Sequence, residues 1–308
     1  MKLPRNLSLR TLLALTAIVA LLALVAIGAY IFIVPAALIS SNLASTFNAS
    51  ERTSHIRVLE ETTKAESGED ASFWLNSGGW AHIEGDTIKT VTGSIPSVSY
   101  WRLRYRISNP LDTDNGYHPQ NVFRLITTTK VRDSEETVYA RILAVNESQS
   151  PNRNESNGIL LMSRFVDGDN LYYAGIRVDG YAVIKRKRDG RYETLALSPL
   201  WTSPEAPYHR SLRPNLIPEG TWIGLKLTTR DRADGSVELS LYIDTSGVWE
   251  LVTSARDHDP LPQEPLQAGI RSDFMDAEFK SFTVREWEGN GLTPPLPRTE
   301  MPANEPEA

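Results

Sequence analysis

Short runs of alternating apolar and polar residues, separated by Asp-Gly pairs, fill the stretch from Asn157 to Ala196. The three pairs are Asp167-Gly168, Asp179-Gly180 and Asp189-Gly190. An Asp-Gly pair between alternating apolar positions is a strong hairpin signal, because a type I′ turn needs positive φ at both central residues. The pattern therefore predicts a four-stranded antiparallel meander.

Cross-strand pairing predicts which side chains share a face of this meander. A two-residue turn at Asp179-Gly180 places Arg186 opposite Tyr173, and a loop from Asp167 to Asn170 places Arg164 opposite Tyr173 as well. One face of the meander is then an apolar core. The other face gathers four side chains: Arg164, Tyr173, Arg177 and Arg186. A slip of one residue in either hairpin would undo this grouping.

The same alternation predicts strands in the rest of the chain. The expected strands cover residues 79–83, 87–92, 101–107, 122–128, 137–145, 222–230, 237–243, 249–254, 267–272 and 278–287. Within 101–107, Trp, Leu, Tyr and Ile alternate with three arginines, as in a half-buried strand. About fourteen strands with frequent turns indicate an all-β fold, a two-sheet antiparallel sandwich over residues 73–288.

The N-terminal region has a different pattern, because it lacks charge altogether. No charged residue occurs from Thr11 to Ser50, and Leu12–Ile39 is almost wholly apolar. A bilayer core of ~30 Å needs ~20 apolar helical residues, so this segment is long enough to span a membrane. Lys2, Arg5 and Arg10 precede it, which predicts a cytoplasmic N-terminus and an extracytoplasmic remainder.

A cleaved signal peptide is the alternative for this segment, with cleavage near residues 35–37 or 42–44. Signal peptides have apolar cores of only ~7–15 residues, so the longer segment favours a retained single-pass anchor. The predicted organisation is a cytoplasmic N-terminus (1–11), a transmembrane helix (12–39), a polar stalk (40–72) with a helix near 51–64, the β-domain (73–288) and a proline-rich acidic tail (289–308) that we expect to be disordered. The predicted location is the cell membrane.

Several short sequences in the β-region resemble a known family. They are Asn157-Gly-Ile-Leu-Leu, Asp169-Asn-Leu-Tyr-Tyr-Ala-Gly-Ile-Arg177, Trp222-Ile-Gly-Leu-Lys-Leu, Ala268-Gly-Ile-Arg-Ser and Ala277-Glu-Phe-Lys-Ser-Phe-Thr-Val. This succession resembles the concanavalin A-like lectin and glucanase jelly rolls, nearest to the laminin-G-like modules of microbial surface proteins. The resemblance covers roughly residues 73–287. It implies a jelly-roll sandwich that binds glycans, cleaves polysaccharides or mediates adhesion.

No catalytic motif of that family is present in the sequence. The glucanases of this fold carry Glu-x-Asp-x-x-Glu, whereas the nearest run here, Asp273 to Glu278, has another order and spacing. The Gln-x-His and Arg-x-Glu-x-Arg signatures of the alginate-lyase-like branch are also missing. The five histidines (55, 82, 118, 209 and 258) are scattered, without metal-ligand spacing. An enzyme would therefore need an active site of a different kind, and no catalytic residue is assigned.

The amino-acid composition limits which cofactors and partners the chain is expected to have. The chain has no cysteine, which excludes disulfides and thiolate metal sites, and its net charge of −6 argues against a nucleic-acid partner. Asp112-Thr-Asp114-Asn-Gly116 and Asp167-Gly-Asp169-Asn170 resemble fragments of calcium loops, but both lack the later Glu, and Asp, Asn and Gly are ordinary turn formers. We expect no cofactor, with calcium as the open alternative.

The predicted ligand site is the polar face of the meander. Its members are Arg164, Tyr173, Arg177 and Arg186, with Trp222 and Lys226 as an extension and Arg141 and Arg271 as further candidates. Aromatic rings stack on sugar faces, and guanidinium groups bind carboxylates through two hydrogen bonds. The sequence thus predicts a membrane-anchored, lectin-like domain that recognises a glycan, acidic glycans included, or another surface component. A polysaccharide-cleaving enzyme and a structural adhesion module are the alternatives.

Overall fold

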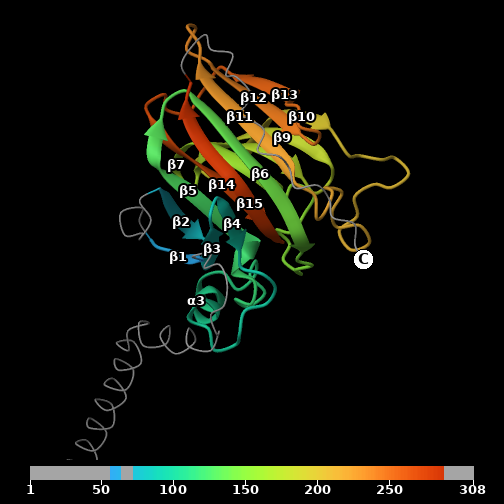
Figure 1. The fold of residues 1–308 in the computed structure, drawn as a ribbon. Coiled ribbons are helices and arrows are strands. Elements are labelled where there is room, and N and C mark those ends of the chain that lie inside the picture. The colour runs from blue at the N-terminus through green and yellow to red at the C-terminus, as the bar shows by residue number, and fades with distance from the viewer. Residues whose placement is uncertain (1–55, 64–71, 288–308) are drawn as a thin grey trace, which may run out of the picture. The chain divides into compact units, whose positions relative to one another are not determined.

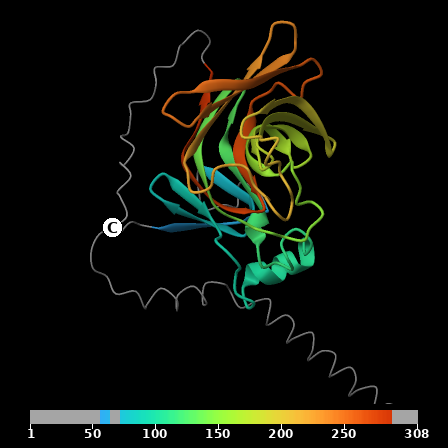
Figure 2. The same cartoon turned by 90° about the vertical axis from the view of Figure 1, so that its right-hand side faces the viewer.

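The chain folds into a two-sheet antiparallel β-sandwich, as the alternation predicts. The computed structural model describes residues 56–63 and 72–287. One sheet has eight strands in the order β1-β3-β4-β15-β6-β11-β12-β13, and the other has seven in the order β10-β9-β8-β7-β14-β5-β2. Figures 1 and 2 show the two sheets stacked face to face.

The strands follow the predicted ranges closely. The eight-stranded sheet contains β1 (Arg57–Glu60), β3 (Trp80–Glu84), β4 (Thr87–Thr90), β6 (Ser134–Val145), β11 (Ile223–Asp231), β12 (Val237–Asp244), β13 (Glu250–Asp257) and β15 (Met275–Glu286). The seven-stranded sheet contains β2 (Phe73–Ser77), β5 (Val122–Val131), β7 (Gly158–Asp167), β8 (Asn170–Arg177), β9 (Tyr181–Arg188), β10 (Arg191–Pro199) and β14 (Leu266–Asp273). The predicted four-stranded meander is β7 to β10, in sequential order along the edge of its sheet.

The core lies between the sheets and takes alternate residues from each strand. Leu161 of β7, Tyr172 of β8, Val138 of β6 and Leu225 of β11 are all fully buried in it. Phe123 and Phe279 stack across the sandwich with ring centroids 5.7 Å apart. This arrangement buries one face of each sheet, so functional side chains must come from the outward faces or from the loops.

Two predictions about local structure are wrong. Residues within 101–107 form helix α3 (Tyr100–Ser108), not a strand. Trp101 and Tyr105, four residues apart, are its buried positions, whereas Leu103 and Ile107 are exposed, so the burial follows the helical period and not the alternation. Both views show α3 at one end of the sandwich (Figures 1 and 2), where its buried residues cluster with Trp80 of β3 and with the loop that follows β4.

The second wrong prediction concerns the stalk. Residues 57–60, expected to be helical, form β1, which pairs with β3 through Leu59 and Ala81 and buries Leu59 in the core. The ordered part of the chain therefore includes a strand that comes before residue 73. The predicted transmembrane helix (12–39) lies outside the described residues, as does the tail. Within residues 56–63 and 72–287, no helix combines the length and apolarity needed to cross a membrane.

Candidate ligand-binding site

The register of the central hairpin decides which side chains share a face, and it differs from the prediction by one residue. Tyr173 of β8 pairs with Lys185 of β9, and Tyr172 pairs with Arg186. At the turn, only Gly180 has a positive φ (+82°), and its N–H donates to the Arg177 carbonyl oxygen. The connection is thus a type I turn followed by a left-handed glycine, which is longer than the two-residue turn assumed from the sequence.

Arg164 does not lie on the predicted ligand face. A bulge between Ser163 and Asp167 interrupts the β7–β8 pairing, and Arg164 adopts a φ of +49° within it. The side chain turns inward, is 1% exposed, and donates to Asp231 Oδ1 at 2.5 Å. Because the bulge reverses the direction of the side chain, the prediction that Arg164 shares a face with Tyr173 is wrong.

Arg186 also points to the inner side of its sheet. The one-residue register difference places it beside Tyr172, and both side chains reach Asp257 of the opposite sheet. The Tyr172 hydroxyl donates to Asp257 Oδ2 at 2.7 Å, and Arg186 Nη1 donates to Asp257 Oδ1 at 2.8 Å. The predicted grouping of Arg186 with Tyr173 is therefore wrong; Arg186 ties the two sheets together near one edge.

Tyr173 and Arg177 do lie on the outward face, together with residues from three other strands. The Tyr173 ring stacks on Tyr192 of β10, with centroids 6.0 Å apart, and its hydroxyl accepts a hydrogen bond of 2.9 Å from Arg271 Nη1. Tyr173 is fully buried, whereas Tyr192 is 55% exposed. Lys185 occupies the position across from Tyr173. These five side chains form the surface that we call the Tyr173 face.

The charges of the Tyr173 face do not balance. Arg177 is paired with Asp179 (2.6 Å) and Arg271 with Asp273 (2.7 Å). Lys185 is 8% exposed and forms no hydrogen bond or ion pair with any described residue. Burial, followed by the neighbouring Arg177 guanidinium, lowers the pKa of Lys185 to about 8. At neutral pH the face therefore carries one buried positive charge more than its carboxylates neutralise.

An apolar layer supports these polar groups on the same side of the sheet. Leu160, Met162 and Val183 are buried with Tyr173 in a cluster that is separate from the main core. Gly175 lies between them, where a Cβ atom would stand 2.1 Å from the Ile159 carbonyl oxygen. Only glycine allows β7 and β8 to approach so closely at this point. The floor of the Tyr173 face is thus a closely packed apolar layer.

Trp222 and Lys226 belong to the other sheet, so the prediction that they extend the Tyr173 face is wrong. Trp222 directly precedes β11 and Lys226 lies within it, both on the outward side of the eight-stranded sheet. Arg141 and Lys280 stack on the Trp222 ring, at 4.6 and 4.5 Å from its centroid, and Lys226 lies 4.9 Å from the Trp249 ring. Their predicted role in ligand binding stays a prediction, now for a second, separate surface.

The candidate calcium loops have their carboxylates engaged by protein donors. Asp112 Oδ1 accepts hydrogen bonds from Ser150 Oγ (2.6 Å) and Asn152 Nδ2 (2.9 Å), and Asp167 Oδ1 accepts from the Asp169 amide (2.7 Å). Within the described residues there is no group of three or more His, Asp or Glu side chains placed to hold a metal ion. The Asp112 loop is therefore joined to the loop after β6, and the Asp167 loop is a turn stabilised by its own aspartate side chain.

Sequence reasoning named Arg271 as a further candidate but missed Lys185 and Tyr192. The predicted register, which differs by one residue from the observed one, had assigned Lys185 to the inner face of the sheet. Tyr192 follows the Asp189-Gly190 turn, where both residues have positive φ (+48° and +78°), as a type I′ turn requires. Counting outward from that turn pairs Tyr192 with Lys187 and so places Lys185 on the same face of the sheet as Tyr192.

Comparisons with known proteins find similarity in structure only. No protein-family model matches the chain, and no curated protein has a matching sequence. Among solved structures, the carbohydrate-binding module CBM66 from Bacillus subtilis is similar at 13% identity and a TM-score of 0.45, covering 71% of this chain and 98% of that one. The exoplasmic/lumenal domain of VIP36, in a Ca²⁺/Man3GlcNAc-bound form, has 11% identity and a TM-score of 0.41, covering 76% and 91%.

A third similar structure is the GH43 protein BlXynB from Bacillus licheniformis, with 10% identity and a TM-score of 0.36. It covers 67% of this chain, which in turn spans only 37% of that protein. At such TM-scores, these likenesses add nothing to the strand order and pairing described above. The class that the chain's own geometry defines is a two-sheet antiparallel β-sandwich with a cationic, aromatic outward face.

Proposed function

We propose that this chain is a single-pass membrane protein displaying a carbohydrate-binding domain outside the cell, and that the domain binds an acidic glycan on the Tyr173 face. We further propose that the sandwich is a concanavalin A-like jelly roll, nearest to laminin-G-like modules. The uncharged segment 12–39 supports the anchor, and the sequence resemblance supports the family. The observation that carries the binding proposal is Lys185, a residue 8% exposed whose ammonium group has no hydrogen-bond or ion-pair partner among the described residues.

A buried cation without a partner is costly, because the protein interior replaces its hydration poorly. Arg177 and Arg271 add positive charge beside Lys185, whereas Asp179 and Asp273 offset only two of the three cations. A carboxylate or sulfate group placed here would neutralise the excess charge and gain charge-assisted hydrogen bonds. The site is therefore suited to an anion, despite the net negative charge of the chain.

Tyr192 supplies the part of the site that suits a sugar. Tyr192 is 55% exposed and its ring stacks on that of Tyr173, so the aromatic group is accessible from solvent while Tyr173 supports one side of it. Lys187 lies 5.1 Å from the centroid of the same ring. A pyranose ring stacked on Tyr192, with its carboxylate near Lys185, would use both features. A uronic-acid-containing glycan has this chemistry.

The binding prediction is tested by calorimetric titration of the full-length chain, purified in mild detergent, with hexagalacturonate and with neutral galactohexaose. We expect the acidic hexasaccharide to bind more tightly, and Lys185→Met to weaken its binding about 10- to 100-fold, because a hydrogen bond to a charged group contributes ~1.5–3 kcal/mol. Affinity should also fall as pH rises from 7 to 10, since Lys185 loses its proton near pH 8. Lys89→Met, on the other sheet, is the matched control.

Three results would contradict the proposal. Unchanged affinity in Lys185→Met removes the ammonium group from the site, and equal affinity for both hexasaccharides removes the preference for acidic glycans. Loss of binding in Trp222→Ala but not in Lys185→Met moves the site to the eight-stranded sheet. Titrations with calcium and with a chelator should agree, because the carboxylates of Asp112 and Asp167 are already engaged by protein donors.

The anchor has its own prediction. If segment 12–39 is a retained transmembrane helix, the full-length chain stays with membranes after washing in alkaline carbonate, which strips peripheral proteins. The mass of the membrane-bound protein, measured by mass spectrometry, should correspond to all 308 residues. A mature protein that begins between residues 38 and 45 would show cleavage and contradict the anchor.

A further inference from the structure

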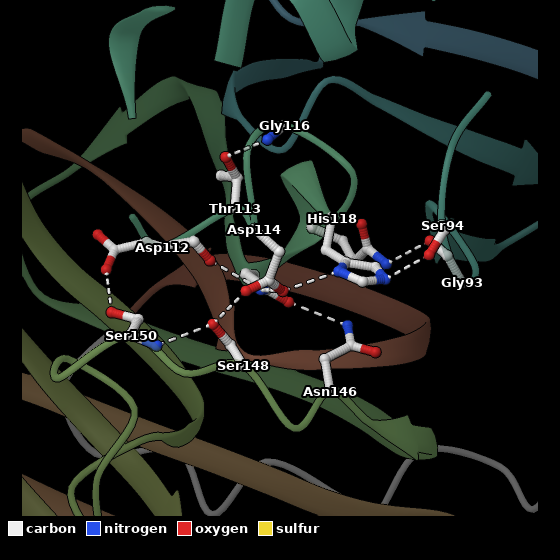
Figure 3. A network of polar contacts seen from close by, with 12 residues as sticks. Gly93, Ser94, Asp112, Thr113, Asp114, Gly116, His118, Asn146, Ser148 and Ser150 are labelled. Atoms are coloured by element: carbon white, nitrogen blue, oxygen red, sulfur yellow. Dashed lines mark hydrogen bonds and ion pairs between the residues drawn. The ribbon is translucent and has the colours of Figure 1, made fainter. Parts of the chain in front are cut away.

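Three side chains in the loops beside α3 form a linear relay that the Tyr173 face does not use. Ser94 Oγ lies 2.7 Å from His118 Nε2, and His118 Nδ1 lies 2.8 Å from Asp114 Oδ2. Figure 3 shows the three side chains in a row, with the imidazole between the hydroxyl and the carboxylate. Ser94 comes from the loop after β4, whereas Asp114 and His118 come from the loop after α3.

The hydrogen-bonding partners of His118 fix where its proton sits. An ionised carboxylate such as that of Asp114 can only accept, so in the neutral imidazole Nδ1 carries the proton. Nε2 is then an acceptor and receives the hydrogen bond of the Ser94 hydroxyl. This is the arrangement in which a histidine can take a proton from a serine as the serine attacks an electrophile.

Further contacts hold the relay in place. Ser148 Oγ donates to Asp114 Oδ1 at 2.6 Å, and Asn121 Nδ2 donates to Oδ2 at 3.3 Å, so both carboxylate oxygens have partners besides the imidazole. On the other side, the Gly93 N–H donates to Asp276 Oδ2 at 2.7 Å and the Gly93 carbonyl oxygen accepts from Gln120 at 2.9 Å. The base and the hydroxyl are therefore both positioned by groups behind them (Figure 3).

The hydroxyl end of the relay faces solvent. Ser94 is exposed, and beyond Gly93 and its two chain neighbours no described heavy atom lies within 4 Å of the place where a Cβ of Gly93 would stand. The Ser94 amide N–H forms no hydrogen bond with any described residue, which leaves one backbone donor next to the hydroxyl. Such an N–H is suited to stabilise an oxyanion that forms at a carbonyl attacked by Ser94 Oγ.

We propose that Ser94, His118 and Asp114 form a hydrolytic site for carboxylic esters. Because Ser94 is exposed, its substrates are small acyl esters, such as O-acetyl groups, carried on the surface of a larger molecule. Ser94 is the nucleophile, His118 the general base and acid, and Asp114 the group that orients the imidazole and stabilises its protonated form. This proposal does not depend on the glycan-binding proposal, since the two sites share no residue.

The reaction balances with water as the only co-substrate. Ser94 Oγ attacks the ester carbonyl carbon while its proton passes to His118 Nε2. The C–O bond to the alcohol then breaks, and the alkoxide leaves with the proton from Nε2, which gives an acyl-Ser94 ester and a free alcohol. A water molecule attacks the acyl group with transfer of its proton to Nε2, and that proton returns to Ser94 Oγ as the carboxylic acid is released.

The first test is chemical and needs no variant. The full-length chain is treated with a fluorophosphonate, in which serine attack at phosphorus expels fluoride, and the labelled residue is located by peptide mass spectrometry. Label on Ser94 is the expected result. Before labelling, the chain should hydrolyse p-nitrophenyl acetate, and this activity should fall as the fraction of labelled protein rises. Absence of both labelling and hydrolysis in the wild-type chain overturns the proposal.

Variants assign the roles. Ser94→Ala should reduce kcat/KM for p-nitrophenyl acetate by roughly 10²- to 10⁴-fold and abolish labelling, and His118→Gln should do the same because it removes the base. Asp114→Asn should lower kcat with little change in KM, since it disturbs the tautomer and not substrate access. Ser211→Ala, at an exposed serine outside the relay, is the control. Equal activity in Ser94→Ala and in the control would overturn the assignment.

Discussion

Glu136→Gln is expected to make the protein more stable than the wild type at alkaline pH while leaving it nearly unchanged at pH 5. Glu136 lies on β6 between the sheets and is fully buried. Ser134 Oγ donates to its Oε1 at 3.1 Å, and Oε2 has no hydrogen-bond partner among the described residues. Burial raises the pKa of Glu136 to about 8, so the folded protein holds this carboxyl protonated at neutral pH.

The sign of the pH dependence follows from that raised pKa. The folded state binds the Glu136 proton more tightly than the unfolded chain, so this contribution to stability is fully present below about pH 4.5 and is lost as pH rises towards 8. Each pH unit in that window costs about 1.4 kcal/mol, which amounts to a loss on the order of 5 kcal/mol over the whole window. A glutamine keeps the shape and hydrogen-bonding capacity of the protonated acid but cannot ionise.

The measurement is urea unfolding of wild type and Glu136→Gln at several pH values between 5 and 9. The difference in unfolding free energy between the two proteins isolates Glu136 from all other titrating groups. Glu135→Gln, on the outward side of the same strand, is the control for loss of one carboxyl group. A difference that stays constant from pH 5 to pH 9 would show that Glu136 does not titrate in this range.

Much of the β-sandwich could be predicted because its signals are local. Asp189-Gly190 forms the expected type I′ turn, and alternation located the strands that flank it to within a few residues. Alternation failed at 101–107 because a run of apolar residues separated by arginines also places Trp101 and Tyr105 four residues apart, on one side of a helix. Contacts with Val91 and Ile95 of the preceding loop, which the sequence does not reveal, decide between the two periods.

The residues of the Tyr173 face were harder to predict because they depend on the strand register. A shift of one residue in the pairing moves every side chain of a strand to the opposite face of the sheet. Asp179-Gly180 has the same sequence signal as Asp189-Gly190, but Asp179 does not adopt a positive φ, and the longer turn shifts every pair in the β8–β9 hairpin. The bulge at Arg164 has no sequence signal at all. The Ser94 relay was also hidden, since its serine and histidine are 24 residues apart in two irregular loops.

The buried Arg164–Asp231 ion pair joins the two sheets, so we expect it to stabilise the fold. Replacing Asp231 is the second substitution for which we expect a large change in unfolding free energy. We expect Asp231→Asn to destabilise the protein by about 3–5 kcal/mol, because it leaves the buried guanidinium of Arg164, 1% exposed, without its carboxylate partner. Arg164 is also 3.7 Å from Asp133, which is too distant to replace that bond. Replacing both partners, in Arg164→Met with Asp231→Asn, should recover much of the loss because no unpaired buried charge remains.

A neighbouring surface pair provides the matched control for this prediction. Arg232 and Glu238 form an ion pair on the same hairpin, with side chains about one-third exposed, so Glu238→Gln should cost less than ~1 kcal/mol. Unfolding in urea compares the four proteins directly. An equal cost for Asp231→Asn and Glu238→Gln would contradict the buried-pair interpretation. Weakened hexagalacturonate binding in a folded Arg164→Met protein would instead return Arg164 to the ligand site, since an arginine that only joins the sheets should leave affinity unchanged.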